Sequence, residues 1–109
     1  MADLSVTVGP ASTAETVAVA PHDRVIIHIE ETPTTGYRWT VDLSDDVLTV
    51  DSDDFRATVG GMPGAAGERT VVLRTTRPGR STVTLRLARE WEAEPARTVR
   101  LDIAIRDTP

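Results

Sequence analysis

Hydrophobic and polar residues alternate along most of this chain. Val25, Ile27 and Ile29 occupy every second position of one segment, so an extended backbone places their side chains on one face. The same alternation recurs at residues 37–42, 54–59, 69–76, 80–89 and 97–106, with shorter runs at 4–8, 15–20 and 47–50. No segment sustains the 3.6-residue period of an amphipathic helix, and the pattern therefore predicts an all-β protein.

Turn-forming residues separate these segments and indicate the architecture. They lie at residues 20–23, 33–36, 43–46, 51–54, 60–67, 77–80 and 92–96. One apolar face and one polar face per strand is typical of antiparallel sheets whose outer face is solvated. Together with the chain length, this predicts an immunoglobulin-like antiparallel β-sandwich of seven to eight strands. We expect one domain over residues 1–109, with a core at roughly 4–106 that contains Trp39, Leu73, Leu85 and Leu101.

Composition narrows the possible partners. The formal net charge of −5 argues against a nucleic-acid surface, because phosphate binding needs a basic face. The absence of Cys excludes disulfides and thiolate chemistry. No apolar run has the length of a membrane span, and the N-terminal residues lack the pattern of a signal peptide. We expect a monomer without a nucleic-acid or membrane partner, either cytoplasmic or a mature secreted form.

Candidate catalytic and metal-binding residues are few. His22 and His28 are the only histidines, and neither has a Cys or a second His at the ligand spacing of a zinc site. The acidic run at residues 51–54 lacks the Gly and Glu positions of a calcium loop and fits a solvated turn. No Ser-His-Asp arrangement can be placed. We therefore expect neither an enzyme nor a protein that carries a metal or a cofactor.

A stiff segment, which we call the first loop, follows the strand predicted around residues 23–30. It consists of Thr32, Pro33, Thr34, Thr35, Gly36 and Tyr37. Pro33 fixes its φ angle, Gly36 permits a positive φ, and the two threonines are β-branched with restricted side chains. Such a loop loses little conformational entropy on docking, which favours recognition over a plain strand connection.

Two later segments also stand out. The second loop, at residues 60–67, is rich in Gly and includes Met62, Pro63, Gly64, Ala65, Ala66 and Gly67. It is either a flexible hairpin connection or a surface that presents its backbone to a partner. The third loop begins with Arg89, Glu90 and Trp91. Acidic neighbours predict an exposed indole, which is a favoured interface anchor, and the alternative is a ring folded over the edge of the core.

The three loops would correspond to the B–C, D–E and F–G loops of an immunoglobulin-like sandwich, which lie at one end. Their motifs resemble those of the chagasin-like inhibitors of papain-family cysteine peptidases, which read Asn-Pro-Thr-Thr-Gly-Tyr/Phe, Gly-x-Gly-Gly and Arg-Pro-Trp. This sequence differs by Thr32 in place of Asn, Ala66 in place of Gly, and Glu90 in place of Pro. The resemblance extends over roughly residues 25–105.

This resemblance implies a reversible, competitive inhibitor of a papain-family cysteine peptidase. The Thr-Thr loop would fill the catalytic centre, and the second and third loops would hold the walls of the cleft. An alternative function is an immunoglobulin-like adhesion or carbohydrate-binding module, with Tyr37 and Trp91 as a stacking platform, and a third is a structural domain without inhibitory activity. An inhibitor needs all three loops at one end, whereas a sugar platform usually lies on a sheet face.

Overall fold

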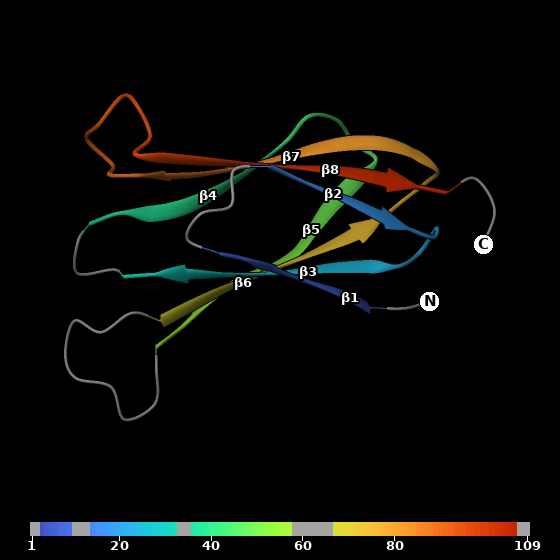
Figure 1. Ribbon diagram of the computed structural model, residues 1–109, viewed down its shortest axis with the longest axis horizontal. Helices are drawn as coiled ribbons and strands as arrows, with labels where there is room; N and C mark the ends of the chain where they lie inside the picture. The colour runs from blue at the N-terminus through green and yellow to red at the C-terminus, as the bar shows by residue number, and fades with distance from the viewer. Residues whose placement is uncertain (1–2, 10–13, 33–35, 58–66, 107–109) are drawn as a thin grey trace.

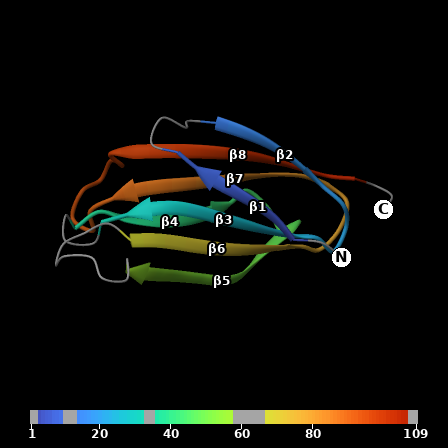
Figure 2. The ribbon, with the colours of Figure 1, turned by 60° about the horizontal axis from the view of Figure 1, so that its bottom comes forward.

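Eight β-strands make up most of the residues that the structure describes. The computed structural model describes residues 3–9, 14–32, 36–57 and 67–106. The strands are β1 (Asp3–Val8), β2 (Ala14–Val19), β3 (Arg24–Glu31), β4 (Arg38–Leu43), β5 (Leu48–Ala57), β6 (Gly67–Thr75), β7 (Gly79–Ala88) and β8 (Arg97–Ile105). They form two four-stranded sheets, in the orders β1-β3-β6-β5 and β2-β8-β7-β4, which pack face to face (Figures 1 and 2). Within these ranges no helix could span a membrane.

The core lies between the two sheets and follows from the alternating pattern. Leu73 of β6, Leu85 of β7 and Leu101 of β8 are fully buried, and Trp39 of β4 retains 3% of its surface exposed. Most inward positions of both sheets are thus filled by apolar side chains, while most outward positions are polar. The predicted all-β sandwich and its four predicted core residues are confirmed.

The sheets are mixed rather than purely antiparallel. β1 pairs with β3 in parallel, β2 pairs with β8 in parallel, and the other four pairings are antiparallel. The chain reverses direction at each connection, so two strands with odd numbers, or two with even numbers, run the same way. Both parallel pairs follow this rule, since β1 and β3 are odd-numbered and β2 and β8 are even-numbered. Hydrophobic alternation indicates which face of a strand is buried, but it carries no information about the direction of its neighbour.

Residues 51–54, predicted as a turn, instead lie inside β5. This single ten-residue strand forms one edge of its sheet, and its register against β6 shifts at a bulge after Val50. Asp51 and Asp53 form ion pairs with arginines of β6 at 2.9 and 2.6 Å. An edge strand tolerates such charges because much of it faces water, and the turn prediction was therefore wrong. Residues 58–59 of the predicted strand lie outside the described residues.

Candidate functional site

The first, second and third loops leave the same end of the sandwich, which we call the loop end. They follow β3, β5 and β7, and Figure 1 shows the bases of all three on one side. Strand pairing sets these bases side by side, because Glu31 lies opposite Gly67 and Gly67 lies opposite Ala57. In the other sheet, Arg38 lies opposite Ala88. The opposite end of the sandwich, which we call the turn end, carries the connections after the even-numbered strands.

The structure describes part of the first and second loops and all of the third. The described residues are Thr32, Gly36 and Tyr37 of the first loop, Gly67 of the second, and Arg89, Glu90 and Trp91 of the third. Pro33, Thr34, Thr35, Met62, Pro63, Gly64, Ala65 and Ala66 lie outside the described residues. The geometry of the loop end therefore rests on the bases of the first two loops and on the whole of the third.

The third loop presents an exposed indole at the loop end. Its backbone turns where the N–H of Glu92 donates to the carbonyl of Arg89 at 3.1 Å, and the N–H of Ala96 donates to the carbonyl of Leu87 at 2.8 Å. Trp91 remains 74% exposed. The predicted exposed ring is confirmed, and a ring folded over the core is excluded. An exposed side chain of this size and rigidity is a typical anchor of protein interfaces.

Arg89 connects the third loop to the first. Its guanidinium carbon lies 4.3 Å from the ring centre of Tyr37 and 5.8 Å from that of Trp91. Each such contact contributes about 0.5–1 kcal/mol at an exposed site. Gly36 has a φ of +82°, and a Cβ atom there would lie 3.3 Å from Cη2 of Trp91. The end of the first loop and the exposed indole are therefore in direct contact.

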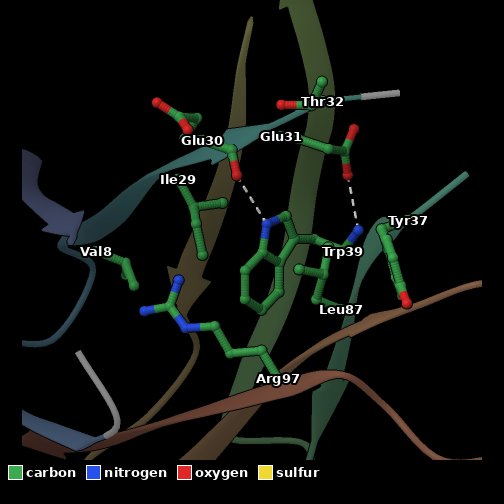
Figure 3. Close-up of a pocket in the computed structure, with 9 residues that line it drawn as sticks. All are labelled: Val8, Ile29, Glu30, Glu31, Thr32, Tyr37, Trp39, Leu87 and Arg97. Carbon is green, nitrogen blue, oxygen red and sulfur yellow. Dashed lines mark hydrogen bonds between the residues drawn. The ribbon is translucent and has the colours of Figure 1, made fainter. Parts of the chain in front are cut away.

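Two hydrogen bonds close the base of the first loop (Figure 3). The backbone N–H of Trp39 donates to Oε1 of Glu31 at 2.7 Å, and the indole N–H of Trp39 donates to the carbonyl of Glu30 at 2.9 Å. β3 and β4 belong to different sheets, so no ladder of backbone hydrogen bonds joins them. The carboxylate of Glu31 supplies the missing connection between the strand before the loop and the strand after it.

Glu31 is itself held by an arginine. It is 3% exposed, and Arg69 of β6 donates to it twice, from Nε to Oε1 at 2.9 Å and from Nη2 to Oε2 at 2.7 Å. Nη1 of Arg69 also donates to Oδ1 of Asp53 at 2.6 Å. The hydrogen bonds to Glu31 and then to Asp53 raise the pKa of Arg69, against the opposing effect of burial. We call this arrangement the Glu31–Arg69–Asp53 network.

Glu31 and Arg69 were not among the predicted site residues, although the alternation of the two strands contained a signal. Glu31 continues the series of inward positions that includes Ile29, and Arg69 lies in the inward series between Gly67 and Val71. A charged residue at an inward position is rarely buried without a partner. Two such residues in the series of two strands could have indicated an ion pair between them.

Gly67 has a packing role at the base of the second loop. A Cβ atom at this position would lie 2.5 Å from the carbonyl oxygen of Arg56 and 2.5 Å from Cζ of Phe55. Both distances are far inside ordinary contact, so a larger residue would displace the edge strand β5. The fold therefore requires this glycine whether or not a partner binds.

The loop end shows no catalytic group among its described residues. A cavity of about 340 Å³ lies beside Trp39, between the apolar side chains of Val8 and Leu87 and the guanidinium of Arg97 (Figure 3). Arg97 lies 5.6 Å from the Trp39 ring centre. In the described part of the chain, no group of three or more His, Cys, Asp or Glu side chains could hold a metal ion. The arrangement is suited to contact with a partner rather than to chemistry.

Comparison with known proteins agrees with this geometry. Residues 18–104 match the sequence profile of the chagasin family peptidase inhibitor I42, which is more than half of the chain. The chain belongs to the chagasin family. Amoebiasin-2 of Entamoeba histolytica is 28% identical over 95 residues, a similarity that covers 84% of this chain and 77% of that protein.

Solved structures of similar proteins share the fold. The crystal structure of the cysteine protease inhibitor EhICP2 from Entamoeba histolytica has a TM-score of 0.82 at 27% identity and covers 96% of each chain. The solution structure of Amebosin has a TM-score of 0.74 at 24% identity, over 94% of this chain and 97% of that one. PbICP-C in complex with falcipain-2 has a TM-score of 0.77 at 12% identity, over 94% and 99%. At such low identity, the last two similarities concern the fold alone.

Membership of the chagasin family confirms the resemblance drawn from the loop motifs. The family consists of peptidase inhibitors, so the expectation that this chain is an inhibitor rather than an enzyme is also confirmed. Of the three departures from the family motifs, Thr32 and Glu90 are described, and Ala66 lies outside the described residues. Glu90 is exposed and directly precedes the exposed Trp91.

Proposed function

We propose that this protein is a reversible, competitive inhibitor of papain-family cysteine peptidases that inserts its three loops into the active-site cleft. The first loop enters the catalytic centre, and the second and third loops contact the two walls. One observation supports this arrangement above the others. The exposed indole of Trp91 is held against the base of the first loop by Arg89, at the end of a chagasin-family sandwich from which all three loops leave.

The physical properties of the first loop suit this role. Pro33 and the β-branched threonines restrict the conformations of the free loop, so little entropy is lost when it docks. The tip carries no charge, and it can therefore enter a narrow slot without burying an unpaired ion. Contacts at its base fix the direction in which the loop leaves the sandwich. A stiff, uncharged and well-supported loop can occupy a catalytic centre in a single shape.

The alternative of a carbohydrate-binding module receives no support from the positions of the aromatic residues. Tyr37 and Trp91 lie at the loop end and not on a sheet face, and the guanidinium carbon of Arg89 lies 4.3 and 5.8 Å from their ring centres. Aromatic residues gathered at one end of the sandwich fit a surface that enters the cleft of a partner.

Glu90 has consequences for the choice of target. The family motif has Pro at this position, and Glu90 adds an exposed negative charge beside the proposed anchor Trp91. Charges at the rim of an interface change the association rate and the selection of partners more than the final affinity. We therefore infer that this inhibitor prefers peptidases whose cleft wall is basic, or at least uncharged, where it faces the third loop.

Titration of papain tests the proposed function directly. Residual activity on a small peptide substrate is measured while purified inhibitor is added, at several substrate concentrations. We expect a dissociable inhibitor that raises KM and leaves kcat unchanged. Arg80→Ala, an exposed change at the turn end, serves as the control and should inhibit like the parent. Lack of inhibition of papain and of related peptidases would refute the proposal. We also propose that residues 1–109 act as one monomeric domain, which size-exclusion chromatography would test.

A further inference from the structure

The Glu31–Arg69–Asp53 network connects the bases of two loops that are far apart in the sequence. Glu31 is the last residue of β3, directly before the first loop, and its carboxylate binds the N–H of Trp39 just after that loop. Arg69 lies two residues after Gly67, where the second loop rejoins the sheet. Asp53 lies on β5, the strand that leads into the second loop. One buried network thus touches the strands on both sides of both loops.

The bonding leaves the Glu31 carboxylate little freedom. Oε1 accepts hydrogen bonds from Trp39 at 2.7 Å and from Arg69 at 2.9 Å, and Oε2 accepts one from Arg69 at 2.7 Å. The side chain of Glu31 is 1% exposed and that of Arg69 is 15% exposed, so water competes weakly for these bonds. Charge-assisted bidentate contacts also have narrow preferred geometry. A displacement of either loop base would break at least one of these hydrogen bonds.

Stability alone does not explain a buried ion pair at this position. Removing two charges from water costs free energy that their attraction often fails to recover, and apolar replacements of similar volume are frequently as stable. Most of the remaining inner surface is filled by apolar side chains, and Thr75 and Ser81 are the other buried polar residues in the described part of the chain. What an ion pair adds over an apolar pair is directional bonding, which fixes the relative position of the groups it joins.

We propose that Glu31 and Arg69 are positioning residues that hold the first and second loops in the relative arrangement needed to enter one cleft. This inference rests on the proposed function, since the loops need a fixed arrangement only if they bind together. Neither residue contacts the peptidase in this proposal. They act through the backbone of Trp39 and through β5 and β6, and they reduce the entropy that the loops lose on binding.

The test replaces the pair by apolar residues and follows two properties. The double variant Glu31→Met/Arg69→Met removes both charges, so neither is left unpaired in the core. Amide hydrogen exchange in the free protein reports the loop bases, through Trp39, Gly36 and Gly67. The inhibition constant for papain reports the binding surface. A matched control is Asp3→Asn/Arg24→Gln, which removes the exposed ion pair at the turn end.

We expect Glu31→Met/Arg69→Met to remain folded, with a lower melting temperature because the Trp39 N–H loses its acceptor, and to keep the slow amide exchange of the core residue Val71. Exchange at Trp39, Gly36 and Gly67 should become at least tenfold faster, and the inhibition constant should rise at least tenfold. The control should change neither property. Unchanged exchange at the loop bases, or an unchanged inhibition constant in a folded variant, would overturn the proposal.

A second variant covers the case in which the double variant does not fold. Glu31→Gln keeps the size of the side chain and an oxygen for the Trp39 N–H, but it weakens the bidentate bond to Arg69. It should show the same two changes to a smaller extent, and their absence would again overturn the proposal. If the parent itself does not inhibit papain, the proposed function fails. The exchange measurement still decides whether the network positions the loop bases.

Discussion

The two ends of the sandwich are held together by different kinds of contact. At the turn end, backbone and hydroxyl hydrogen bonds hold the connections, some within one turn and some between turns, such as that from the N–H of Thr76 to the carbonyl of Val47 at 2.9 Å. The N–H of Asp23 donates to the carbonyl of Ala20 at 3.1 Å, and the Asp23 carboxylate accepts from the N–H of Ala20 at 2.9 Å. At the loop end, a buried ion pair joins Glu31 to Arg69 at 2.7 Å.

The difference shows what each kind of connection requires. Short turns rich in Asp, Ser and Thr satisfy part of their backbone through their own side chains, as Asp23 does for Ala20. Hydroxyl and backbone bonds between turns satisfy other groups, as the Thr76 hydroxyl does for the Val47 carbonyl at 2.7 Å. The exposed ion pair between Arg24 and Asp3 at the turn end, at 2.8 Å, adds little to stability. At the loop end, the buried side chains of Glu31 and Arg69 instead join the bases of the first and second loops. Buried charges can be useful where they fix geometry, and in this protein they lie at the bases of the proposed binding loops.

The largest difference between the two ends is expected when a charge is introduced at Thr35 in the first loop. Thr35→Arg would bring a long, charged side chain into a narrow catalytic slot, and we expect it to weaken the inhibition of papain by about 3–5 kcal/mol. Thr35→Ser is the matched control, because it removes one methyl group and should cost only about 1 kcal/mol. Melting temperatures should hardly change for either variant. Inhibition by Thr35→Arg equal to that of the parent would show that this loop stays outside the cleft.

A core substitution should affect both ends together. Leu85 of β7 is fully buried, and Leu85→Ala should lower the free energy of unfolding by about 2–5 kcal/mol through lost burial and the cavity that remains. Chemical denaturation followed by circular dichroism measures this loss. At a temperature where the variant is fully folded, its inhibition constant should stay close to that of the parent. A large loss of inhibition in folded Leu85→Ala would mean that the loop end depends on the core more directly than its contacts indicate.

Trp91→Ala should affect the loop end alone. The ring is 74% exposed, so its loss should leave the melting temperature nearly unchanged. If the indole is an anchor, inhibition of papain should weaken by about 2 kcal/mol, roughly thirtyfold. Inhibition constants and melting curves of the same preparations measure the effects on binding and on stability. An unchanged inhibition constant would remove Trp91 from the binding surface.

The sequence predicted those parts of the fold that depend on a single strand. Alternation identified the inward residues Leu73, Leu85 and Leu101, because it reflects which face of each strand is buried. It could not predict the parallel edges, since strand direction depends on which strands become neighbours. The turn predicted from the acidic run at residues 51–54 was wrong for a similar reason. In isolation such a run favours a turn, and pairing with arginines of β6 makes it part of a strand.

At the candidate site too, local features were predictable from the sequence and contacts between strands were less so. The exposure of Trp91 was predictable because its charged neighbours are adjacent in the sequence. The contact between Glu31 and Arg69 was predictable only in part. Their inward positions indicated two charges that need partners, but which groups meet depends on the register of β3 against β6, which places Ile29 opposite Arg69. Register is set by pairing and turn geometry, and no local pattern reports it. Local motifs thus predicted the proposed binding residues, while the contacts of the residues that we propose to position them became visible only in the structure.

The smallest expected effect lies at the turn end and depends on pH. The hydrogen bond from Arg77, and then its charge, lowers the pKa of Asp46 below its ordinary value. A lowered carboxyl pKa means that the pair stabilises the fold above the ordinary pKa of about 4, and that this contribution disappears as pH falls through the lowered pKa. The parent should therefore melt slightly above Asp46→Asn at pH 7, and the difference should vanish at about pH 2. Inhibition of papain at pH 7 should be equal for both proteins, because Asp46 lies at the end away from the loops. A difference in melting temperature that persists in acid would assign the effect of the substitution to packing or backbone contacts rather than to charge.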